Sequence, residues 1–306
     1  MVTTDVLVVG AGPAGLTAGI YASRFGHQVI ILEKSFTGGQ LAMTSEVENY
    51  PGFAEPVRGL LLAETMQLQA TRFGCQMVNA EATAVSADEH GFAVTTPVDR
   101  ILARALVICT GAKPRKLDAP GEVELIGRGV SYCAVCDGPL FKGRQVAVVG
   151  GGDAALDEAL YLAGICSRVH VIHRRDEFRG CKMAEDRLRQ KGNVVFHLST
   201  VVEAVKGRDR IESLELRSLR DGSRRQLPVD GLFIYVGWLP NIGWCSSFVR
   251  LDDAGWVVTD SQLRTNVPGV FAAGDVRNTP LRQVATAVGD GALAALMAHG
   301  FLSGKR

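Results

Sequence analysis

Two cysteines that are separated by only two residues give this sequence its clearest capacity for chemistry. Cys133 and Cys136 lie in the stretch SYCAVCDG, and Asp137 follows them directly. A pair with this spacing can ligate a metal, close a structural disulfide, or carry two electrons as a dithiol. A zinc site needs two more ligands at suitable spacing, and the sequence contains no second Cys-x-x-Cys pair and no His-x₃₋₅-His pair.

The composition favours a redox pair over a structural disulfide. Seven cysteines at mostly irregular spacing do not resemble the disulfide framework of a secreted protein, and we find no targeting signal. The apolar stretch 6–22 lacks the basic segment that begins a signal peptide. We therefore expect a cytoplasmic protein without a membrane partner, in which a static disulfide is unusual. The net charge of +1 argues against nucleic acid as a partner.

A glycine-rich turn near the N-terminus predicts a nucleotide site. The stretch DVLVVGAGPAGLTAGIYASRFGHQVIILEK reads as a buried strand, a helix over about 13–25 and a second strand that ends at Glu33. The candidate residues of the turn are Gly10, Gly12, Pro13, Ala14 and Gly15. The glycines allow a tight turn and close approach of a pyrophosphate, and the helix N-terminus offers free N–H groups to it. A carboxylate at residue 33 can accept hydrogen bonds from a ribose 2′-hydroxyl.

The stretch RQVAVVGGGDAALDEALYLAGICSRVHVIHRR repeats this pattern, with Gly150 in the place of Gly10, a shift of 140 residues. Candidate residues at the second turn are Gly152, Asp153 and Ala154. The place of Glu33 is taken by a histidine, and three arginines follow; this group is His173, Arg174, Arg175 and Arg179. A carboxylate repels a 2′-phosphate, whereas guanidinium groups bind it with charge-assisted hydrogen bonds. The first turn therefore suits FAD or NAD, and the second suits NADP.

Two more matching strands indicate the domain organisation. ALVICTGAKP (105–114) and GLFIYVGWLP (231–240) are both apolar and end in glycine and then an X-Pro pair, which is extended. Thr110 and Gly111 end the first of them and are further candidates for contact with the first nucleotide. We predict an α/β protein with two Rossmann-like dinucleotide-binding domains, the second inserted in the first. The first domain should span 1–113 and 244–306, and the second should span 114–243.

The tail after residue 244 has to complete the first domain. Its stretch TNVPGVFAAGDVRN contains an apolar strand that ends at Gly274 and Asp275. Ligands of open α/β sheets bind at the carboxyl ends of the strands. A polyol hydroxyl would satisfy the Asp275 carboxylate there.

With these pieces assembled, the chain resembles low-molecular-weight thioredoxin reductases over nearly its full length. The motifs that carry the resemblance are GAGPAG, GGQL, VENYPGF, CAVCDG, GGGDAA, HRRDEFR, GVFAAGDV and RQVATAVGDG. The resemblance implies a homodimeric FAD enzyme that passes electrons from NADPH through the flavin and the cysteine pair to thioredoxin. Two departures are Ala-Val inside the pair, where Ala-Thr is more usual, and Tyr132 before Cys133. Neither removes a required group.

The resemblance also implies roles for individual residues. Cys136 would face the flavin, Cys133 would exchange with the thioredoxin disulfide, and Asp137 would protonate the leaving thiolate. Residues near the isoalloxazine or the ribityl chain would be Gly39, Gln40, Asn49, Asp275, Arg282, Gln283 and Val284.

Three alternatives to thioredoxin reduction stay open. The chain could reduce another small dithiol carrier such as a glutaredoxin-like protein. It could transfer electrons from NADPH to ferredoxin or free flavin, which leaves CAVCDG without a role, or act as a non-catalytic FAD-binding redox sensor. A disulfide needs the flavin as mediator, yet CAVCDG lies in the predicted NADPH domain. We therefore hypothesise that this domain rotates about linkers at 112–118 and 239–245.

Overall fold

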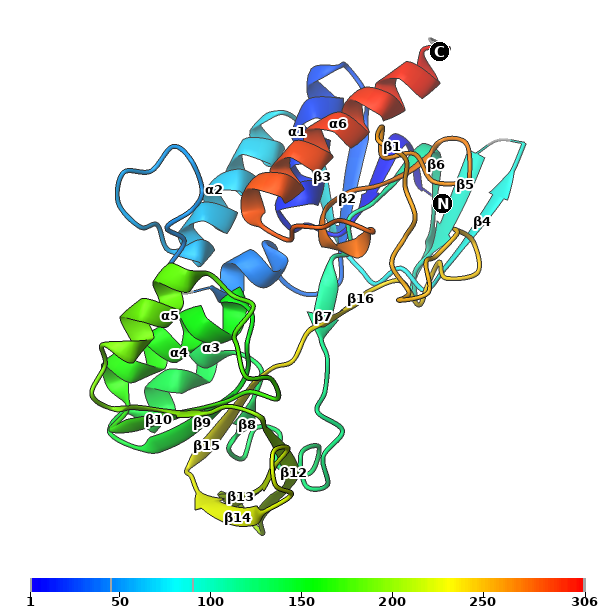
Figure 1. Cartoon of the computed structure of the whole chain (residues 1–306). Helices are drawn as coiled ribbons and strands as arrows, with labels where there is room; N and C mark the ends of the chain where they lie inside the picture. The colour runs from blue at the N-terminus through cyan, green and yellow to red at the C-terminus, as the bar shows by residue number, and fades with distance from the viewer. Residues whose placement is uncertain (1, 45, 90, 305–306) are drawn as a thin grey trace. The chain divides into compact units, whose positions relative to one another are not determined.

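The chain forms two compact units in the computed structural model, which describes residues 2–44, 46–89 and 91–304 (Figure 1). Unit 1 consists of Met1–Lys113 and Leu239–Arg306, and unit 2 is the continuous segment Pro114–Trp238. Unit 2 thus ends at residue 238, whereas the sequence-based boundary lies after residue 243. The assignment of a nucleotide to each unit stays a prediction.

Unit 1 is built on a seven-stranded sheet in the order β3-β2-β1-β6-β5-β4, with β17 paired to the second half of β6. The strands are β1 (Val2–Val9), β2 (Val29–Glu33), β3 (Gln76–Asn79), β4 (Ala84–Asp88), β5 (Gly91–Thr95), β6 (Arg100–Ile108) and β17 (Val270–Ala272). The β4–β5 and β5–β6 pairs are antiparallel, and the other pairs are parallel. The apolar run of β1 suits a strand that is covered on both faces.

Each face of this sheet has its own core. On one face, Val6 and Val8 pack with buried residues of three helices, α1 (Pro13–Arg24), α2 (Gly59–Arg72) and α6 (Val284–Leu302). On the other face, Leu7 and Val9 pack with the β4–β5 hairpin and with the chain between 242 and 276. Two short 3₁₀ helices complete unit 1, η1 (Gly39–Met43) and η3 (Gly274–Val276).

Helix α6 is apolar and packs against α1 in unit 1 with one face of small residues. Among the described residues it is the one helix long and apolar enough to cross a membrane, by length and composition alone. Its buried residues are Ala287, Gly291, Ala294, Ala295 and Ala298. This small-residue face lies against α1, where a Cβ at residue 291 would stand 2.2 Å from the Ala14 carbonyl oxygen. The other residues of this helix are half-buried or exposed.

Unit 2 is built on a parallel sheet in the order β11-β10-β9-β15-β8 and carries an antiparallel β12-β13-β14 sheet. The strands are β8 (Val130–Ser131), β9 (Gln145–Gly150), β10 (Arg168–Ile172), β11 (Val194–His197), β12 (Thr200–Gly207), β13 (Ile211–Ser218), β14 (Arg224–Pro228) and β15 (Gly231–Tyr235). The helices are α3 (Ala134–Asp137), η2 (Gly138–Phe141), α4 (Asp153–Ile165) and α5 (Lys182–Arg189).

The internal repeat of the sequence is also a repeat of strand register. Val6 pairs with Val29 in unit 1, and Val146 pairs with Val169 in unit 2, which is the same pairing after the shift of 140. Val6 and Val146 also pair with Ala105 and Gly231, the first residues of the matching stretches ALVICTGAKP and GLFIYVGWLP. Two Rossmann-like sheets, as predicted, therefore share one internal arrangement.

The chain crosses between the units through two short paired strands, β7 (Ala112–Pro114) and β16 (Trp238–Pro240). Within unit 2, the Arg115 N–H donates to the Gly237 carbonyl at 2.9 Å. Within unit 1, the Asn241 N–H donates to the Gly111 carbonyl at 2.9 Å. The two crossings are thus tied to each other at both ends.

Candidate redox and nucleotide-binding sites

The two cysteines of the CAVCDG stretch form a disulfide at the start of α3. Their Cα atoms are 5.4 Å apart, Cys133 is half-buried, and Cys136 is exposed. Cys133 caps the helix, because its sulfur accepts a hydrogen bond from the Cys136 N–H at 3.1 Å. Gly138 lets the turn lie on α4, since a Cβ there would meet Tyr161 at 3.0 Å. The pair is therefore carried on a short turn that a longer helix supports.

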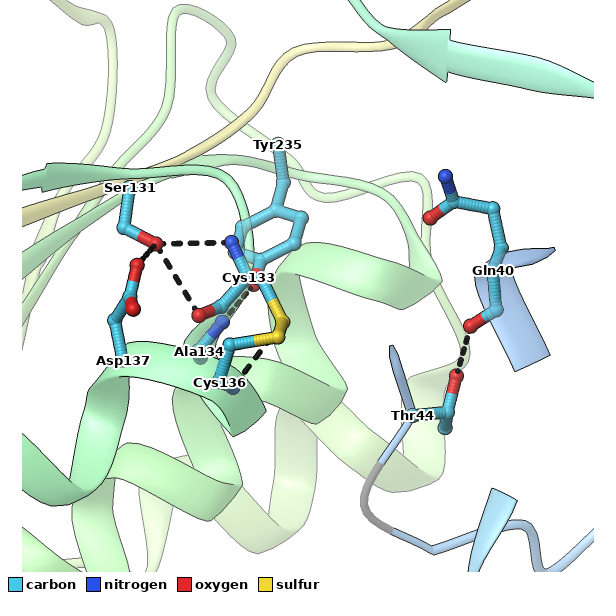
Figure 2. Close-up of a disulfide and its surroundings, with 8 residues drawn as sticks. All are labelled: Gln40, Thr44, Ser131, Cys133, Ala134, Cys136, Asp137 and Tyr235. Atoms are coloured by element: carbon cyan, nitrogen blue, oxygen red, sulfur yellow. Dashed lines mark hydrogen bonds between the residues drawn. A yellow bond between two sulfur atoms is a disulfide. The ribbon is translucent and has the colours of Figure 1, made fainter. Parts of the chain in front are cut away.

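Asp137 is held beside the disulfide by a hydroxyl that the sequence did not single out. Ser131 is 5% exposed, and its Oγ donates to Asp137 Oδ2 at 2.6 Å (Figure 2). The same Oγ accepts from the Cys133 N–H at 3.0 Å. Ser131 therefore links the backbone of one cysteine to the carboxylate that follows the other.

Tyr235, at the end of β15, supports the same turn through its hydroxyl. The hydroxyl accepts from the Ala134 N–H at 2.8 Å, and burial raises the pKa of this phenol (Figure 2). Glu158 of α4 adds to that shift through its charge. Glu158 is itself largely buried, which raises its pKa to about 7, and its Oε2 has no hydrogen-bond partner within the described residues.

A buried carboxylate ties the residue before Cys133 to the entry of unit 2. Glu122 is 0% exposed and accepts from the Tyr132 hydroxyl at 2.6 Å. It also accepts from the backbone N–H groups of Leu117 and Ala119, at 3.0 and 3.3 Å. The hydroxyl of Tyr132, a residue that departs from the expected motif, therefore has its hydrogen-bond partner inside unit 2.

In unit 1, the first glycine turn has the geometry that the motif predicts. Gly10 has a φ of +107°, and a Cβ there would lie 2.3 Å from the Cys109 carbonyl oxygen. A Cβ at Gly12 would have only the Gly38 carbonyl within 4 Å, so the turn is open beside it. Glu33 lies at the end of β2 and accepts from the Ala11 N–H at 2.9 Å. Its Oε1 accepts from the N–H and the hydroxyl of Ser35, so the capacity for a ribose hydroxyl remains at Oε2.

Three buried polar atoms of unit 1 have no hydrogen-bond partner among the described residues. They are Thr110 Oγ1, shortly after the end of β6, Trp244 Nε1 and Arg282 Nε. The Arg282 guanidinium lies 3.8 Å from the ring centre of Trp256, and burial lowers its pKa. Burial likewise raises the pKa of Asp275 to about 6. Buried groups of this kind fit a polar ligand such as FAD, which would supply the missing partners.

The structure joins two other predicted flavin neighbours that are far apart in sequence. Asn49 Nδ2 donates to Gln283 Oε1 at 3.0 Å, and Gln283 caps α6 directly before Val284. Gly39 and Gln40 begin η1, where the Thr44 hydroxyl donates to the Gln40 carbonyl at 3.0 Å (Figure 2). All of these residues belong to unit 1, and their roles beside a flavin stay predictions.

An ion pair that sequence reasoning missed fixes the turn that contains Asp275. Arg277 donates to both carboxylate oxygens of Asp290 of α6, with Nε 2.7 Å from Oδ2. Asp290 also accepts from the Gly274 N–H at 3.0 Å. Asp290 stands in the stretch RQVATAVGDG, and a charged residue within an otherwise apolar helix was the available signal.

The second glycine turn, in unit 2, matches the first in its close contacts. Gly150 has a φ of +157°, and a Cβ there would lie 2.4 Å from the Tyr235 carbonyl oxygen. A Cβ at Gly152 would meet no atom within 4 Å, so the space beside this glycine is open. Asp153 accepts from the Cys181 N–H at 2.6 Å, and Ala154 follows it in the first turn of α4. The turn is thus open on the Gly152 side, where a pyrophosphate is expected.

The histidine and the arginines after β10 differ in their surroundings. His173 is 5% exposed and stacks on Phe178 at 5.4 Å, and its Nε2 has no partner within the described residues. Burial lowers the pKa of this imidazole. The three arginines are exposed, and no side-chain partner is found for them in the described part of the chain; they are Arg174, Arg175 and Arg179. Three unpaired guanidinium groups at a strand's carboxyl end fit a phosphate monoester.

A redox-active disulfide and two dinucleotide-type turns in one α/β chain define a nucleotide-dependent disulfide oxidoreductase. Residues 4–291 match the pyridine nucleotide-disulphide oxidoreductase family, and the chain belongs to this family. The predicted membership is thereby confirmed.

Relatives and solved structures that are similar to this chain are named thioredoxin reductases. The thioredoxin reductase of Treponema pallidum (strain Nichols) is 42% identical over 298 residues, which cover 97% of each chain. The crystal structure of Lactococcus lactis thioredoxin reductase in the FR conformation matches with a TM-score of 0.96 and 39% identity, over 98% of this chain and 99% of that one. A ferredoxin-flavin thioredoxin reductase from Clostridium acetobutylicum matches with a TM-score of 0.54 and 31% identity, over 99% of each chain.

Proposed function

We propose that this protein is an NADPH-dependent thioredoxin-disulfide reductase that contains FAD. The observation that carries the proposal is the Cys133–Cys136 disulfide, one sulfur of which belongs to an exposed residue, in the unit that also holds the second glycine turn. Relatives named thioredoxin reductase, similar over nearly the whole chain, support it. The homodimer and the cytoplasmic location stay predictions.

Unit 1 would hold FAD. The open side of the first turn faces no side chain, so the pyrophosphate would receive N–H groups from the start of α1. Glu33 would bind the adenosine ribose, and Asp275 would accept from the ribityl hydroxyls. Thr110 and Arg282 would find partners for their buried polar atoms. When bound, FAD carries an electron pair from the reduced nicotinamide to the disulfide.

Unit 2 would hold NADPH. The start of α4 would bind its pyrophosphate, and the exposed arginines after β10 would bind the 2′-phosphate. His173 would support the turn, since its buried ring lies against Gly151, where a Cβ would be 2.3 Å from it. The same arginines favour NADPH over ferredoxin as the electron donor.

The cysteine pair would then reduce thioredoxin by exchange. After two electrons open the disulfide, the Cys133 thiolate attacks one sulfur of the thioredoxin disulfide and expels the other as a thiolate. Asp137 gives that thiolate a proton. Cys136 next attacks the Cys133 sulfur and expels the second thioredoxin thiolate, which restores the enzyme disulfide. Two electrons and two protons have then moved from the enzyme dithiol to thioredoxin, because the Cys133 proton passes through Asp137 to the first thiolate and the Cys136 proton passes to the second.

The test is stopped-flow absorbance of the holoenzyme mixed with NADPH and then with oxidised thioredoxin. In wild type, NADPH should bleach the flavin and thioredoxin should restore its absorbance. Cys136→Ser should keep the bleaching and lose the thioredoxin-dependent recovery. Cys181→Ser is the matched control, because this exposed cysteine is free, and it should behave as wild type.

Other outcomes separate the remaining candidates. Recovery with a glutaredoxin-like protein but not with thioredoxin would reassign the substrate to another dithiol carrier. Recovery with thioredoxin in Cys136→Ser would remove the cysteine pair from the electron path. Absence of bleaching by NADPH would remove the proposed donor.

A further inference from the structure

Ser131 has an unusual set of partners for a hydroxyl that no motif includes. It is the last residue of β8, at the carboxyl end of a strand in the parallel sheet of unit 2, and it is 5% exposed. Its Oγ lies 2.6 Å from Asp137 Oδ2, 3.0 Å from the Cys133 nitrogen and 3.2 Å from the Cys133 carbonyl oxygen (Figure 2).

These three contacts suit both protonation states of the carboxyl group. A serine hydroxyl has one proton to donate and two lone pairs that accept. With an ionised Asp137, Ser131 accepts from the Cys133 N–H and donates to the carboxylate. With a protonated Asp137, the carboxyl donates to Oγ, and the hydroxyl proton turns to the Cys133 carbonyl oxygen. Neither state leaves a buried donor without an acceptor.

We propose that Ser131 is a positioning residue that holds Asp137 for proton transfer to the leaving thiolate during disulfide exchange. The inference rests on the proposed function, because it names Ser131 as the residue that holds Asp137, the acid of that reaction. In the step concerned, the Cys133 thiolate forms a bond to one substrate sulfur and the substrate S–S bond breaks. The released thiolate takes the proton of Asp137, whose carboxylate then accepts from Ser131.

A merely structural role for Ser131 has to be separated from this one, because short hydroxyl bonds to a neighbouring backbone also stabilise turns. The two roles differ in their dependence on the leaving group. An alkyl thiolate needs a proton as it leaves, whereas an aryl thiolate of low pKa leaves readily without one. A loosened turn slows both reactions, but a misplaced acid slows only the first.

The experiment uses the holoenzyme reduced with dithiothreitol and freed of reductant, so that it depends neither on NADPH nor on thioredoxin. Its reoxidation is timed with hydroxyethyl disulfide, which releases an alkyl thiolate, and with dithiobis-nitrobenzoate, which releases an aryl thiolate. We expect Ser131→Ala to slow the first reaction roughly tenfold and the second by less than about twofold, since positioned acids contribute factors of this order or more. Ser131→Thr, which keeps a hydroxyl, should restore the first rate.

Tyr235→Phe is the matched control. It also deletes a buried hydroxyl that is bonded to this turn, at Ala134, but it leaves Asp137 untouched. Tyr235→Phe should change the reoxidation rates with the two disulfides by the same factor. In addition, Ser131→Ala should add nothing to the loss caused by Asp137→Asn, because the two side chains act as one unit.

Equal slowing of both disulfides by Ser131→Ala, or additive losses with Asp137→Asn, would overturn the inference. The wild-type enzyme could fail to reduce thioredoxin with NADPH while Ser131→Ala still slows only the reaction with hydroxyethyl disulfide. That result would refute the proposed function and leave this inference standing.

Discussion

The two glycine turns share one backbone geometry, and the residues that end the second strand or follow it differ between them. Both turns have the same backbone requirement, because a carbonyl oxygen lies 2.3 Å from a Cβ at Gly10 and 2.4 Å from one at Gly150. The difference lies after the second strand, where unit 1 has a carboxylate and unit 2 has exposed guanidinium groups. We therefore expect single residues to discriminate between a ribose and a phosphoribose.

Removal of one of these arginines should weaken binding of the phosphorylated nucleotide selectively. Arg175→Ala deletes a charge-assisted contact of about 1.5–3 kcal/mol, which corresponds to roughly 10- to 100-fold in the Kd of NADPH. The Kd of NADH should hardly change. Titration of flavin reduction with each nucleotide measures both values.

Arg168→Ala is the control for this substitution, because Arg168 is exposed at the opposite end of the same strand. It should leave the ratio of the two dissociation constants unchanged. An equal loss of NADPH and NADH affinity in Arg175→Ala would show that this arginine does not read the 2′-phosphate.

The buried carboxyl group of Glu158 leads to a prediction about how the stability of the protein depends on pH. Burial raises its pKa from 4.5 to about 7, so the folded protein keeps this proton over a range in which the unfolded chain has lost it. The free energy of unfolding therefore falls by about 2–3 kcal/mol as the pH rises from about 4.5 to about 7, and it stays low above that range. Glu158→Gln should remove this fall. Urea unfolding of both proteins at about pH 5 and about pH 8 measures the difference.

The exposed Glu212→Gln serves as the control, and its unfolding should depend on pH as in wild type. A pH dependence that is unchanged in Glu158→Gln would mean that this carboxyl ionises normally in the folded protein.

At the scale of elements, a glycine sets how closely helices α6 and α1 approach each other. Helix α6 carries Gly289, which is exposed, and Gly291, which is buried against α1. A Cβ at residue 291 would stand 2.2 Å from the Ala14 carbonyl oxygen, whereas a Cβ at residue 289 would meet no atom within 4 Å. The two positions thus form a matched pair in one helix.

Gly291→Ala should destabilise unit 1 by about 1–3 kcal/mol through overpacking, and it should weaken FAD retention because Ala14 belongs to the first turn. Gly289→Ala should instead stabilise the helix by up to about 1 kcal/mol. Thermal unfolding and the flavin content of the purified proteins check both outcomes. A destabilised Gly289→Ala protein would contradict the assigned packing of α6.

The elements that the sequence predicted are those with a local pattern. The strand ending at Glu33 and the helix starting at Pro13 were found because glycines, apolar runs and a helix stop lie close together in the chain. The contacts that were missed join distant residues, as Asn49 does with Gln283. Ser131 was missed for another reason, since a lone serine before a motif carries no periodic signal. Tertiary partners of this kind appear only when the strands are placed.

At the scale of the molecule, the way the chain enters and leaves unit 2 makes that unit separable. Unit 2 is one continuous segment, and the strands that lead into and out of it pair with each other. It has its own buried core on both faces of its sheet. A continuous segment with its own core has what a domain needs to fold alone.

The fragment 114–238, expressed by itself, should fold cooperatively and bind NADP⁺. Its affinity should stay within about tenfold of that of the whole protein, since the candidate phosphate ligands all lie inside it. Circular dichroism and calorimetric titration measure folding and binding, and the fragment carrying Arg175→Ala is the binding control. A fragment that folds but does not bind NADP⁺ would place part of the nucleotide site in unit 1.

The strand register shared by the two units indicates that they arose by duplication of one segment. A shift of 140 residues carries Val6 and its partner Val29 onto the equivalent pair of unit 2, and the pairing of Val6 with Ala105 also recurs there. One ancestral coding segment, copied and then inserted into its own original, accounts for both. After such an event the copies need not have changed their backbones to acquire different cofactors. The predicted difference in cofactor requires changes only at the last residue of one strand and in the loop that follows, and the pairing of β7 with β16 keeps the two ends of the interrupted unit together.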